Sequence, residues 1–591
     1  IRLPLLLTFH LLSGCSFVFL QVKLPKSVVW CSHMSSIATF LFNATIGWLV
    51  NKGRDVTAEK LKEGDVTDKK VHDLIVREVE DIKSKLDGLS RMYLETAVDS
   101  FETGVRYLFQ ALDVKPSGEA SAATEKTSME KIQKIDLDEA TKITLSQAKE
   151  RFKMAREKAT EASNNKALKV FDRITAIRCR VMAAILESVV ETARTVGDLS
   201  PASVKSALEN ALPECDQCLQ KLHCLPAVQG NFKVELDEGV LNVRGRYGRD
   251  ERRMIISTVC QVNRAIYNAT QAVGRDLHVL VWPSVDTGED KVDPLRDGRI
   301  SKVLNKVDMQ HCCVTPWSFG QEGDWEHKLK LPCGIATNTK GQFLIADNWD
   351  KTLKVFDCNG KFDFRFNPQT YDADTKFDIL DVTTAGEDDK IYLLVKLEKP
   401  GAEEWENEVQ VFNKTADLQH KFPVRRECWT LTVSSGKQRG KILLLRDDDV
   451  DVHDEPSGEF VCSFGGGAVI PSLASLNTTC DGRVMAVDPR DDSFYLFDVE
   501  GHQLGKFNIK YERDVYYRIA CHPGSDHVVL AGHERETYRL TLAIYTVNGE
   551  FVRRIQLDEV VWHLNGITVT VEGHIAVAST DKHYKQKVIV I

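Results

Sequence analysis

The chain has 591 residues, of which 43% are hydrophobic and 28% charged, and its formal net charge is −9 at pH 7. This composition excludes a collagen-like, low-complexity or wholly disordered chain and is typical of a soluble protein with more than one domain. Much of the negative charge lies in the C-terminal half, which argues against nucleic acid as a partner because an acidic surface repels phosphate.

The apolar N-terminus admits two interpretations. An apolar stretch of signal-peptide length follows Arg2, and residues 12–15 resemble the cleavage box of a bacterial lipoprotein. The residues after that box stay apolar, so we favour translation from Met34, with residues 1–33 as an upstream extension; the alternative is a cleaved signal or anchor. A second apolar run, residues 37–50, is short for a membrane span and is expected to dock in the helical domain, with a membrane-surface anchor as the alternative.

Residues 34–282 are predicted to form an α-helical domain. Apolar residues recur at three- and four-residue spacing over about 71–108 and 137–195, with charged residues between them. Shorter helices are expected at about 201–223 and 251–273, and a small hairpin at 232–243. The apolar stripe is wider than a heptad seam, which favours a helical bundle over a coiled coil between chains, although self-association through the helices stays open.

Two features of this domain could support binding. A face rich in Lys and Arg between residues 149 and 180 could bind an acidic partner or anionic lipid, but a solvated face is the simpler interpretation. Cys215, Cys218, His223 and Cys224 could hold part of a zinc site, but no second CxxC pair is near, so no metal is assigned. The fifteen scattered cysteines are typical of a reduced cytosolic protein.

Residues 283–310, with two prolines and many aspartates, are predicted to be a linker. Beyond them a segment recurs about every 45 residues, and its clearest copy has three short apolar strands closed by Gly or Asp turns, followed by a fourth strand. Later copies start near residues 380, 429, 473, 518 and 565. One such unit cannot bury its faces alone, whereas units stacked radially can, which predicts a six-bladed β-propeller over residues 311–591.

The first copy, residues 332–360, resembles an NHL repeat, the blade of propellers in tripartite-motif proteins and in several secreted enzymes. The resemblance implies a TolB-like propeller in which Gly341 makes a turn and Asp347 closes the next turn through hydrogen bonds to the backbone. No RING-like run of Cys and His and no B-box is present, so ubiquitin-ligase chemistry is not implied. The residues that carry the blade motif are Gly334, Gly341, Asp347, Phe356, Gly360, Gly482, Asp488, Phe497, Gly501, Gly549 and Gly573.

The sixth copy ends at Ile591 without an outer strand, and residues 313–320 resemble one. Trp317, Phe319 and Gly320 are therefore predicted to close the ring by pairing with the last blade, which removes two sheet edges. Sequence beyond Ile591 is the alternative. The expected fold class is multidomain, α plus all-β, with a helical bundle followed by a six-bladed propeller.

No catalytic motif is evident: the chain has no phosphate-binding loop and no Gly-X-Ser-X-Gly elbow, and the glycines at 465–467 are interpreted as an inter-blade turn. The acidic run at 447–451 could take calcium, but its spacing matches no EF-hand loop and a solvated loop tip is expected. Several histidines could converge on the propeller axis and bind a metal, as in lyases and lactonases built on related propellers. They are His522, His527, His533, His563, His574 and His583, and only His522 and His563 are near predicted inner strands.

We therefore expect no enzyme, cofactor or metal site, and no membrane contact unless residues 1–20 or 37–50 act as an anchor. The favoured hypothesis is a cytoplasmic scaffold or adaptor whose propeller loops bind a protein partner while its helices dock or self-associate. One alternative is a metal-dependent propeller hydrolase or lyase. Another is a secreted or surface-anchored recognition protein, with glycan on sequons such as Asn413 or Asn477.

Overall fold

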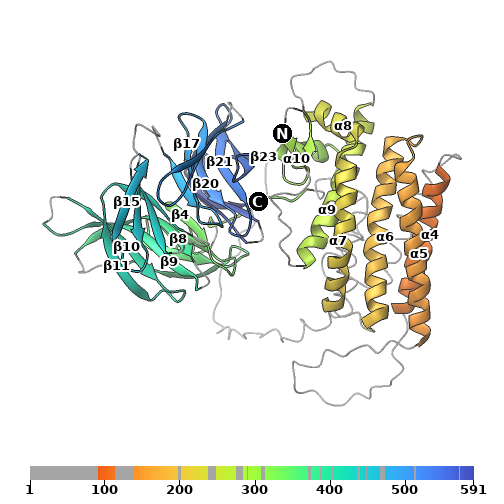
Figure 1. Ribbon diagram of the computed structural model, residues 1–591, viewed down its shortest axis with the longest axis horizontal. Coiled ribbons are helices and arrows are strands. Elements are labelled where there is room, and N and C mark those ends of the chain that lie inside the picture. The colour runs from red at the N-terminus through yellow and green to blue at the C-terminus, as the bar shows by residue number, and fades with distance from the viewer. Residues whose placement is uncertain are drawn as a thin grey trace, which may run out of the picture.

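The computed structural model describes residues 91–112, 139–196, 201–236, 248–273 and 284–591, the last range without 289, 308–312, 322, 370–373, 386–387, 402–403, 435–439, 447–448, 466–472, 511–513 and 572. In this part of the chain seven helices are followed by a six-bladed β-propeller (Figure 1), which confirms the predicted fold class. The predicted leader at 1–33, the apolar run at 37–50 and the first part of the first predicted helix lie outside the described residues.

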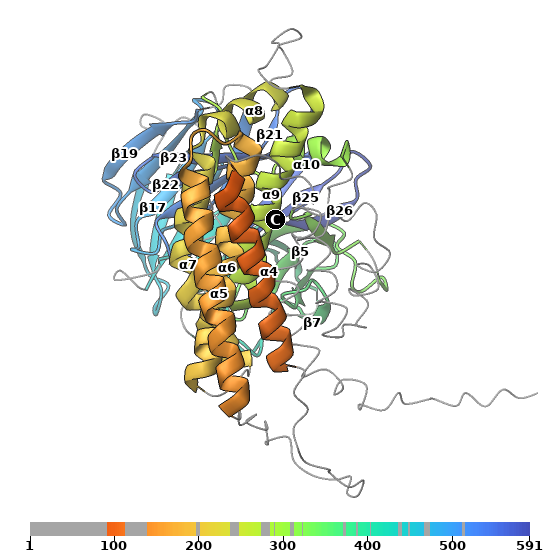
Figure 2. The ribbon, with the colours of Figure 1, turned by 90° about the vertical axis from the view of Figure 1, so that its right-hand side faces the viewer.

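The helical bundle packs its long helices side by side (Figure 2), and their chain order is visible in Figure 1. Its helices are α4 (Met92–Leu112), α5 (Glu139–Asn164), α6 (Val170–Val196), α7 (Pro201–His223), α8 (Pro226–Leu236) and α9 (Arg249–Val273). The stretch expected at 137–195 is two helices, because the chain turns at 165–169. The prediction of a hairpin at 232–243 was wrong for residues 232–236, which continue helix α8. This helix buries Val228 and Phe232, which lie one helical turn apart.

Small residues let the first helices of the bundle approach closely. Half of the buried residues of α5 are alanines, on both sides of Phe152. A Cβ atom at Gly104 of α4 would lie only 2.8 Å from the Phe152 ring. Part of the predicted basic face forms ion pairs inside the bundle. Arg156 of α5 lies 2.7 Å from Glu187 of α6, and Arg180 lies 3.0 Å from Glu214 of α7.

Six sheets form the propeller, each an antiparallel meander that begins at its inner strand. Blade 1 holds β4 (Pro332–Thr337), β5 (Phe343–Asp347), β6 (Thr352–Phe356) and β7 (Phe362–Phe366). Blade 2 holds β8 (Lys376–Ala385), β9 (Lys390–Glu398), β10 (Glu406–Phe412) and β11 (Leu418–Val424). Blade 3 holds β12 (Cys428–Val433), β13 (Lys441–Arg446), β14 (Asp449–Asp454) and β15 (Phe460–Gly465).

The remaining blades follow the same order. Blade 4 holds β16 (Ser475–Thr478), β17 (Val484–Asp488), β18 (Ser493–Phe497) and β19 (Gln503–Asn508). Blade 5 holds β20 (Asp514–Cys521), β21 (His527–Glu534), β22 (Arg539–Thr546) and β23 (Phe551–Val560). Blade 6 holds β24 (His563–Val569), β25 (Ile575–Thr580), β26 (Gln586–Val590) and, from before blade 1, β3 (Trp317–Phe319).

Strand β3 closes the ring by pairing antiparallel with β26, with Phe319 opposite Val588 and Trp317 opposite Val590. The Phe319 side chain of β3 packs over the neighbouring blade, as the phenylalanines of other outer strands do. A Cβ atom at Gly360 in the next blade would lie 2.7 Å from the Phe319 ring. The same arrangement of an outer-strand phenylalanine over the glycine of the next blade recurs for Phe422 and Gly458, Phe464 and Gly501, and Phe507 and Gly549.

The residues expected to form a linker instead fold between the two domains. Strands β1 (Val285–Asp286) and β2 (Lys291–Val292) form a hairpin that extends blade 5, with Val292 of β2 paired in parallel to Arg554 of β23. Helix α10 (Gly298–Asn305) begins at the N-cap Asp297 and lies against β23. The apolar side chains of this segment belong to the core of the bundle. The sequence predicted a linker here because strands of only two residues show no alternation of apolar and polar side chains.

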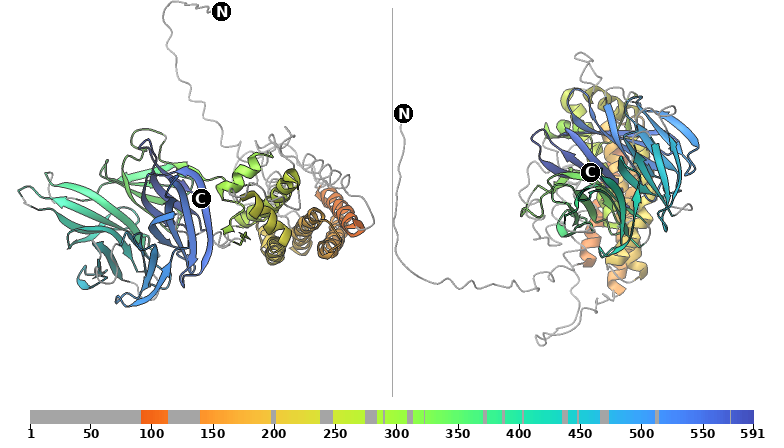
Figure 3. Two further views of the ribbon diagram at one scale, coloured as in Figure 1. Left: turned by 90° about the horizontal axis from the view of Figure 1, so that it is seen from above. Right: turned by 90° about the vertical axis from the view of Figure 1, so that its left-hand side faces the viewer.

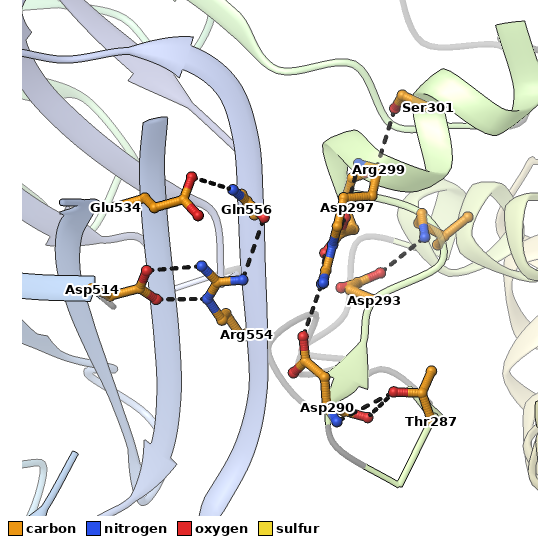
Figure 4. Close-up of polar contacts among 11 residues, drawn as sticks. Thr287, Asp290, Asp293, Asp297, Arg299, Ser301, Asp514, Glu534, Arg554 and Gln556 are labelled. Carbon is orange, nitrogen blue, oxygen red and sulfur yellow. Dashed lines mark hydrogen bonds and ion pairs between the residues drawn. The ribbon is translucent and has the colours of Figure 1, made fainter. Parts of the chain in front are cut away.

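Two clusters of polar side chains lie at this junction, one around Arg299 and one around Arg554 (Figure 4). Asp293 forms an ion pair of 2.7 Å with Arg553 of β23, and each side chain is only 1% exposed. Arg299 bridges Asp290 and Asp297, and Arg554 binds both carboxylate oxygens of Asp514. The helical domain therefore lies beside blade 5, next to β23 (Figure 3).

Candidate functional site

The inner strands of the blades share a β-bulge that shapes the central channel. The ladder shifts by one residue before Gly334, Asp381, Thr430, Arg518 and Gly566, whereas β16 begins directly at Ser475. A bulge bends its strand and re-aims the following side chain. We call these six residues the channel ring: Gly334, Asp381, Thr430, Ser475, Arg518 and Gly566.

The channel ring carries two opposite charges, Asp381 on blade 2 and Arg518 on blade 5. These blades are three apart in a ring of six, so the two residues belong to opposite walls. The small residue on blade 1 makes room for the carboxylate, since a Cβ atom at Gly334 would lie 2.1 Å from Asp381 Oδ1.

Three donors hold the Asp381 carboxylate. Its Oδ1 accepts a hydrogen bond from the Val382 N–H at 2.8 Å, and its Oδ2 accepts from the Leu431 N–H at 3.0 Å and from the Thr430 hydroxyl. Burial raises the pKa of Asp381 to about 6, although these hydrogen bonds oppose the increase. Asp381 therefore titrates just below neutral pH and joins blades 2 and 3 at the axis.

Arg518 places its guanidinium in the channel wall. Nη1 donates to the carbonyl oxygens of Ala474 and Tyr517, at 3.1 and 3.2 Å. In the described part of the chain Arg518 makes no ion pair, and Nε and Nη2 have no hydrogen-bond partner there. Burial lowers the pKa of this guanidinium, and the charge of Asp381 partly opposes that decrease.

All members of the channel ring except Gly334 line a cavity of about 290 Å³ to which all six blades contribute. Its wall is about equally polar and apolar, because the inner strands place threonine, serine and asparagine side chains among aliphatic ones. Trp429, which is 55% exposed, lies at the end where the inner strands begin, and Val571 lies at the other end. Asn477, one of the sequons, faces this cavity and accepts a hydrogen bond from the Cys521 N–H, a setting that leaves little room for a glycan.

One face of the propeller gathers exposed aromatic side chains. Connections between blades, and those between the second and third strands of a blade, lie at the end where the inner strands begin. Six exposed aromatic residues lie in these connections or at the start of an inner strand: Trp325, Trp349, Trp429, Tyr538, Trp562 and Tyr584. We call this surface the aromatic face. Trp562 lies 6.3 Å, centroid to centroid, from both Tyr538 and Tyr584, so part of the surface is contiguous.

The opposite face, which we call the turn face, holds most of the glycines of the predicted blade motif. Gly341, Gly360, Gly482, Gly501, Gly549 and Gly573 all adopt a positive φ, between 72° and 91°, in tight turns. Gly341 lies in the turn between β4 and β5. Asp347 ends β5, and its Oδ1 accepts the Trp349 N–H at 3.3 Å in the turn that follows, which was its predicted role. The same carboxylate also accepts the N–H groups of Lys330 and Leu331. Asp488, Phe356 and Phe497 are buried within the blades.

The candidate metal ligands do not converge. His522 follows the end of β20, whereas His563 begins β24, so the two lie at opposite ends of the channel. His223 Nε2 lies within hydrogen-bond distance of Asn263 Oδ1, at 2.9 Å. Cys215 and Cys218 are buried in α7. No group of three or more metal-binding side chains occurs among the residues described. The acidic run expected as a loop tip includes Asp449 and Asp451 of strand β14, while 447–448 lie outside the described residues.

Comparisons with known proteins found solved structures of low similarity. No family model and no curated protein matches the chain. A streptogramin B lyase structure matches with a TM-score of 0.33 and 10% identity, over 46% of this chain and 97% of that one. Virginiamycin B lyase from Staphylococcus aureus matches with 0.30 and 12%, over 44% and 94%. A chain of the Mitotic Checkpoint Complex matches with 0.32 and 9%, over 46% and 89%.

Proposed function

We propose that this protein is a non-enzymatic interaction scaffold whose aromatic face binds a protein partner. The observation that carries the proposal is the uneven distribution of exposed aromatic side chains on the propeller. Six of those described lie on the aromatic face, from Tyr538 at 44% exposed to Tyr584 at 71%. Two others, Trp317 and Phe460, lie where outer strands begin near the turn face. Contiguous exposed aromatic residues mark interaction sites, because Trp and Tyr bury much apolar area at low entropic cost.

The attachment of the helical domain supports this role. It meets the propeller at β23, the outer strand of blade 5, and the aromatic residues remain exposed when both domains are present. The bundle is free to dock or self-associate on its other sides, and a cytoplasmic location is part of the same proposal. The cysteines of the described residues are free thiols. None of the described helices has the length and apolar character that a membrane span requires.

Affinity capture with matched variants tests the proposal. The double variant Trp562→Ala and Tyr584→Ala should lose specific partners that the wild-type chain retains. Leu504→Ala, which removes a comparably exposed apolar side chain from outer strand β19, should retain them. Equal partner recovery by all three proteins, each shown to be folded, would contradict the proposal.

A further inference from the structure

We propose that the central channel is a binding site for a carboxylate, which pairs with Arg518 inside the channel ring. The site does not depend on a protein partner at the aromatic face. It goes beyond that proposal by naming a ligand chemistry for the cavity.

The first argument is the state of the Arg518 guanidinium. Arg518 is half-buried, and a cation that is partly withdrawn from water is stabilised by a paired anion. Asp381 does not supply this pair, because Thr430, Leu431 and Val382 hold it on the opposite wall. Arg518 uses one of its terminal nitrogens to bind backbone carbonyls, so Nε and Nη2 can still donate into the cavity. A planar carboxylate matches two neighbouring N–H donors of a guanidinium.

The second argument is the lining of the cavity. Ser475 accepts a hydrogen bond from the Ile519 N–H at 3.4 Å, so its hydroxyl hydrogen is available to a ligand. The charged residues among the described lining are Arg518, Asp381 and Asp389, and Asp389 is engaged by Thr339 through two hydrogen bonds. One cation facing one fixed carboxylate suits a ligand with a single negative charge better than a phosphate dianion, which Asp381 would repel.

The third argument is size and access. A cavity of about 290 Å³ lies just below the range of roughly 300–1,000 Å³ typical of small-molecule sites. It opens beside Trp429 of the aromatic face. A small organic acid or the acidic end of a peptide fits this volume, and both offer the same chemistry.

Calorimetric titration of the full chain tests the site with two singly charged probes, butyrate and an acetyl-capped tripeptide of alanine with a free C-terminal carboxylate. Binding of butyrate assigns a free organic acid, and binding of the peptide alone assigns a carboxylate carried by a polypeptide. Butyramide, the neutral analogue, should not bind, and this control requires no change to the protein. If neither acid binds, or if butyramide binds equally well, the proposal fails, while the proposed partner at the aromatic face is unaffected.

Variants locate the binding residue. Arg518→Met should weaken binding roughly 10- to 100-fold, as expected for loss of a charge-assisted hydrogen bond. Arg518→Lys keeps the positive charge but loses the two parallel N–H donors of the guanidinium, and it should weaken binding roughly 3- to 10-fold. This variant replaces Arg518→Met in the test if the methionine variant does not fold. Arg483→Met, at an arginine paired with Asp481 on the turn face, should change nothing. Unchanged affinity in a folded Arg518→Met or Arg518→Lys protein would overturn the assignment.

Discussion

The two faces of the propeller are made by the same chain meander but use different side chains. On the turn face, glycines with positive φ and capping residues such as Asp357 and Asp498 close tight turns. On the aromatic face, connections of varied length carry tryptophan and tyrosine side chains that stay exposed, and Tyr538 and Tyr584 themselves adopt a positive φ. The difference teaches that the turns of one end are closed mainly by glycine, whereas those of the other end also present large side chains.

The largest effect on stability is expected beneath the aromatic face, where buried polar side chains bind one another. This face is therefore constrained by structure as well as available for binding. Asp347 and Lys354 are both fully buried and lie 2.9 Å apart. Lys354 also pairs with Asp350, so the substitution Asp347→Ala leaves it one carboxylate partner. Two backbone N–H groups lose their acceptor as well, and together these losses should lower the free energy of unfolding by roughly 3–5 kcal/mol. Urea denaturation measures this loss. Asp357→Ala, which removes only turn hydrogen bonds to the backbone, should cost about 1 kcal/mol, and equal losses would contradict this account.

The next prediction sharpens the role of the turn face. Gly549 has φ 81°, and a Cβ atom there would lie 2.0 Å from the Phe507 ring. Gly549→Ala combines backbone strain with overpacking and should destabilise by roughly 2–4 kcal/mol. Gly401→Ala is the matched control, because Gly401 has φ 77° but a Cβ atom there would have no described atom within 4 Å, so only about 1 kcal/mol is expected. Similar melting temperatures for both variants would rule out the packing contribution.

A third prediction concerns the channel between the faces. The pKa of Asp381 is raised to about 6 in the folded protein, above roughly 3.9 in an unfolded chain, so the folded state binds this proton more tightly. Its contribution favours folding below about pH 4 and is lost as the pH rises to about 6, by up to roughly 3 kcal/mol. Chemical denaturation across this range should show the decline in wild type relative to Asp381→Asn. Parallel profiles would show that Asp381 is not perturbed.

The smallest effect on stability is expected where the effect on binding is greatest. Trp562 is 46% exposed, so Trp562→Ala should change the free energy of unfolding by less than about 1 kcal/mol. The same substitution should reduce partner binding, because exposed aromatic residues are frequent hot spots. A large drop in melting temperature would instead identify Trp562 as a structural residue.

The sequence predicted the propeller well because its turns repeat. Gly341, Gly501 and Gly549 recur with apolar strands between them, and six copies lacking one outer strand predict closure by a strand from before the first copy. The junction could not be predicted in this way. Its strands have two residues each, and the pairing of Asp293 with Arg553 joins positions far apart in the sequence.

The channel ring was also missed, for a different reason. Asp381 and Arg518 come from separate blades, and neither lies in a recognisable motif. The bulges that align them are set by strand pairing, which leaves no local signal in the sequence. Superposing the six copies on their second strands would have placed the two residues at equivalent positions.

The seam between β3 and β26 also affects how the protein is made. Residues 317–319 leave the ribosome before any complete blade, whereas their partners at 588–590 follow only after the first five blades. Until then β3 and the unfinished sixth blade each present an unpaired edge, the kind of surface that chaperones shield from aggregation. The ring therefore cannot close during synthesis until β26 has been made.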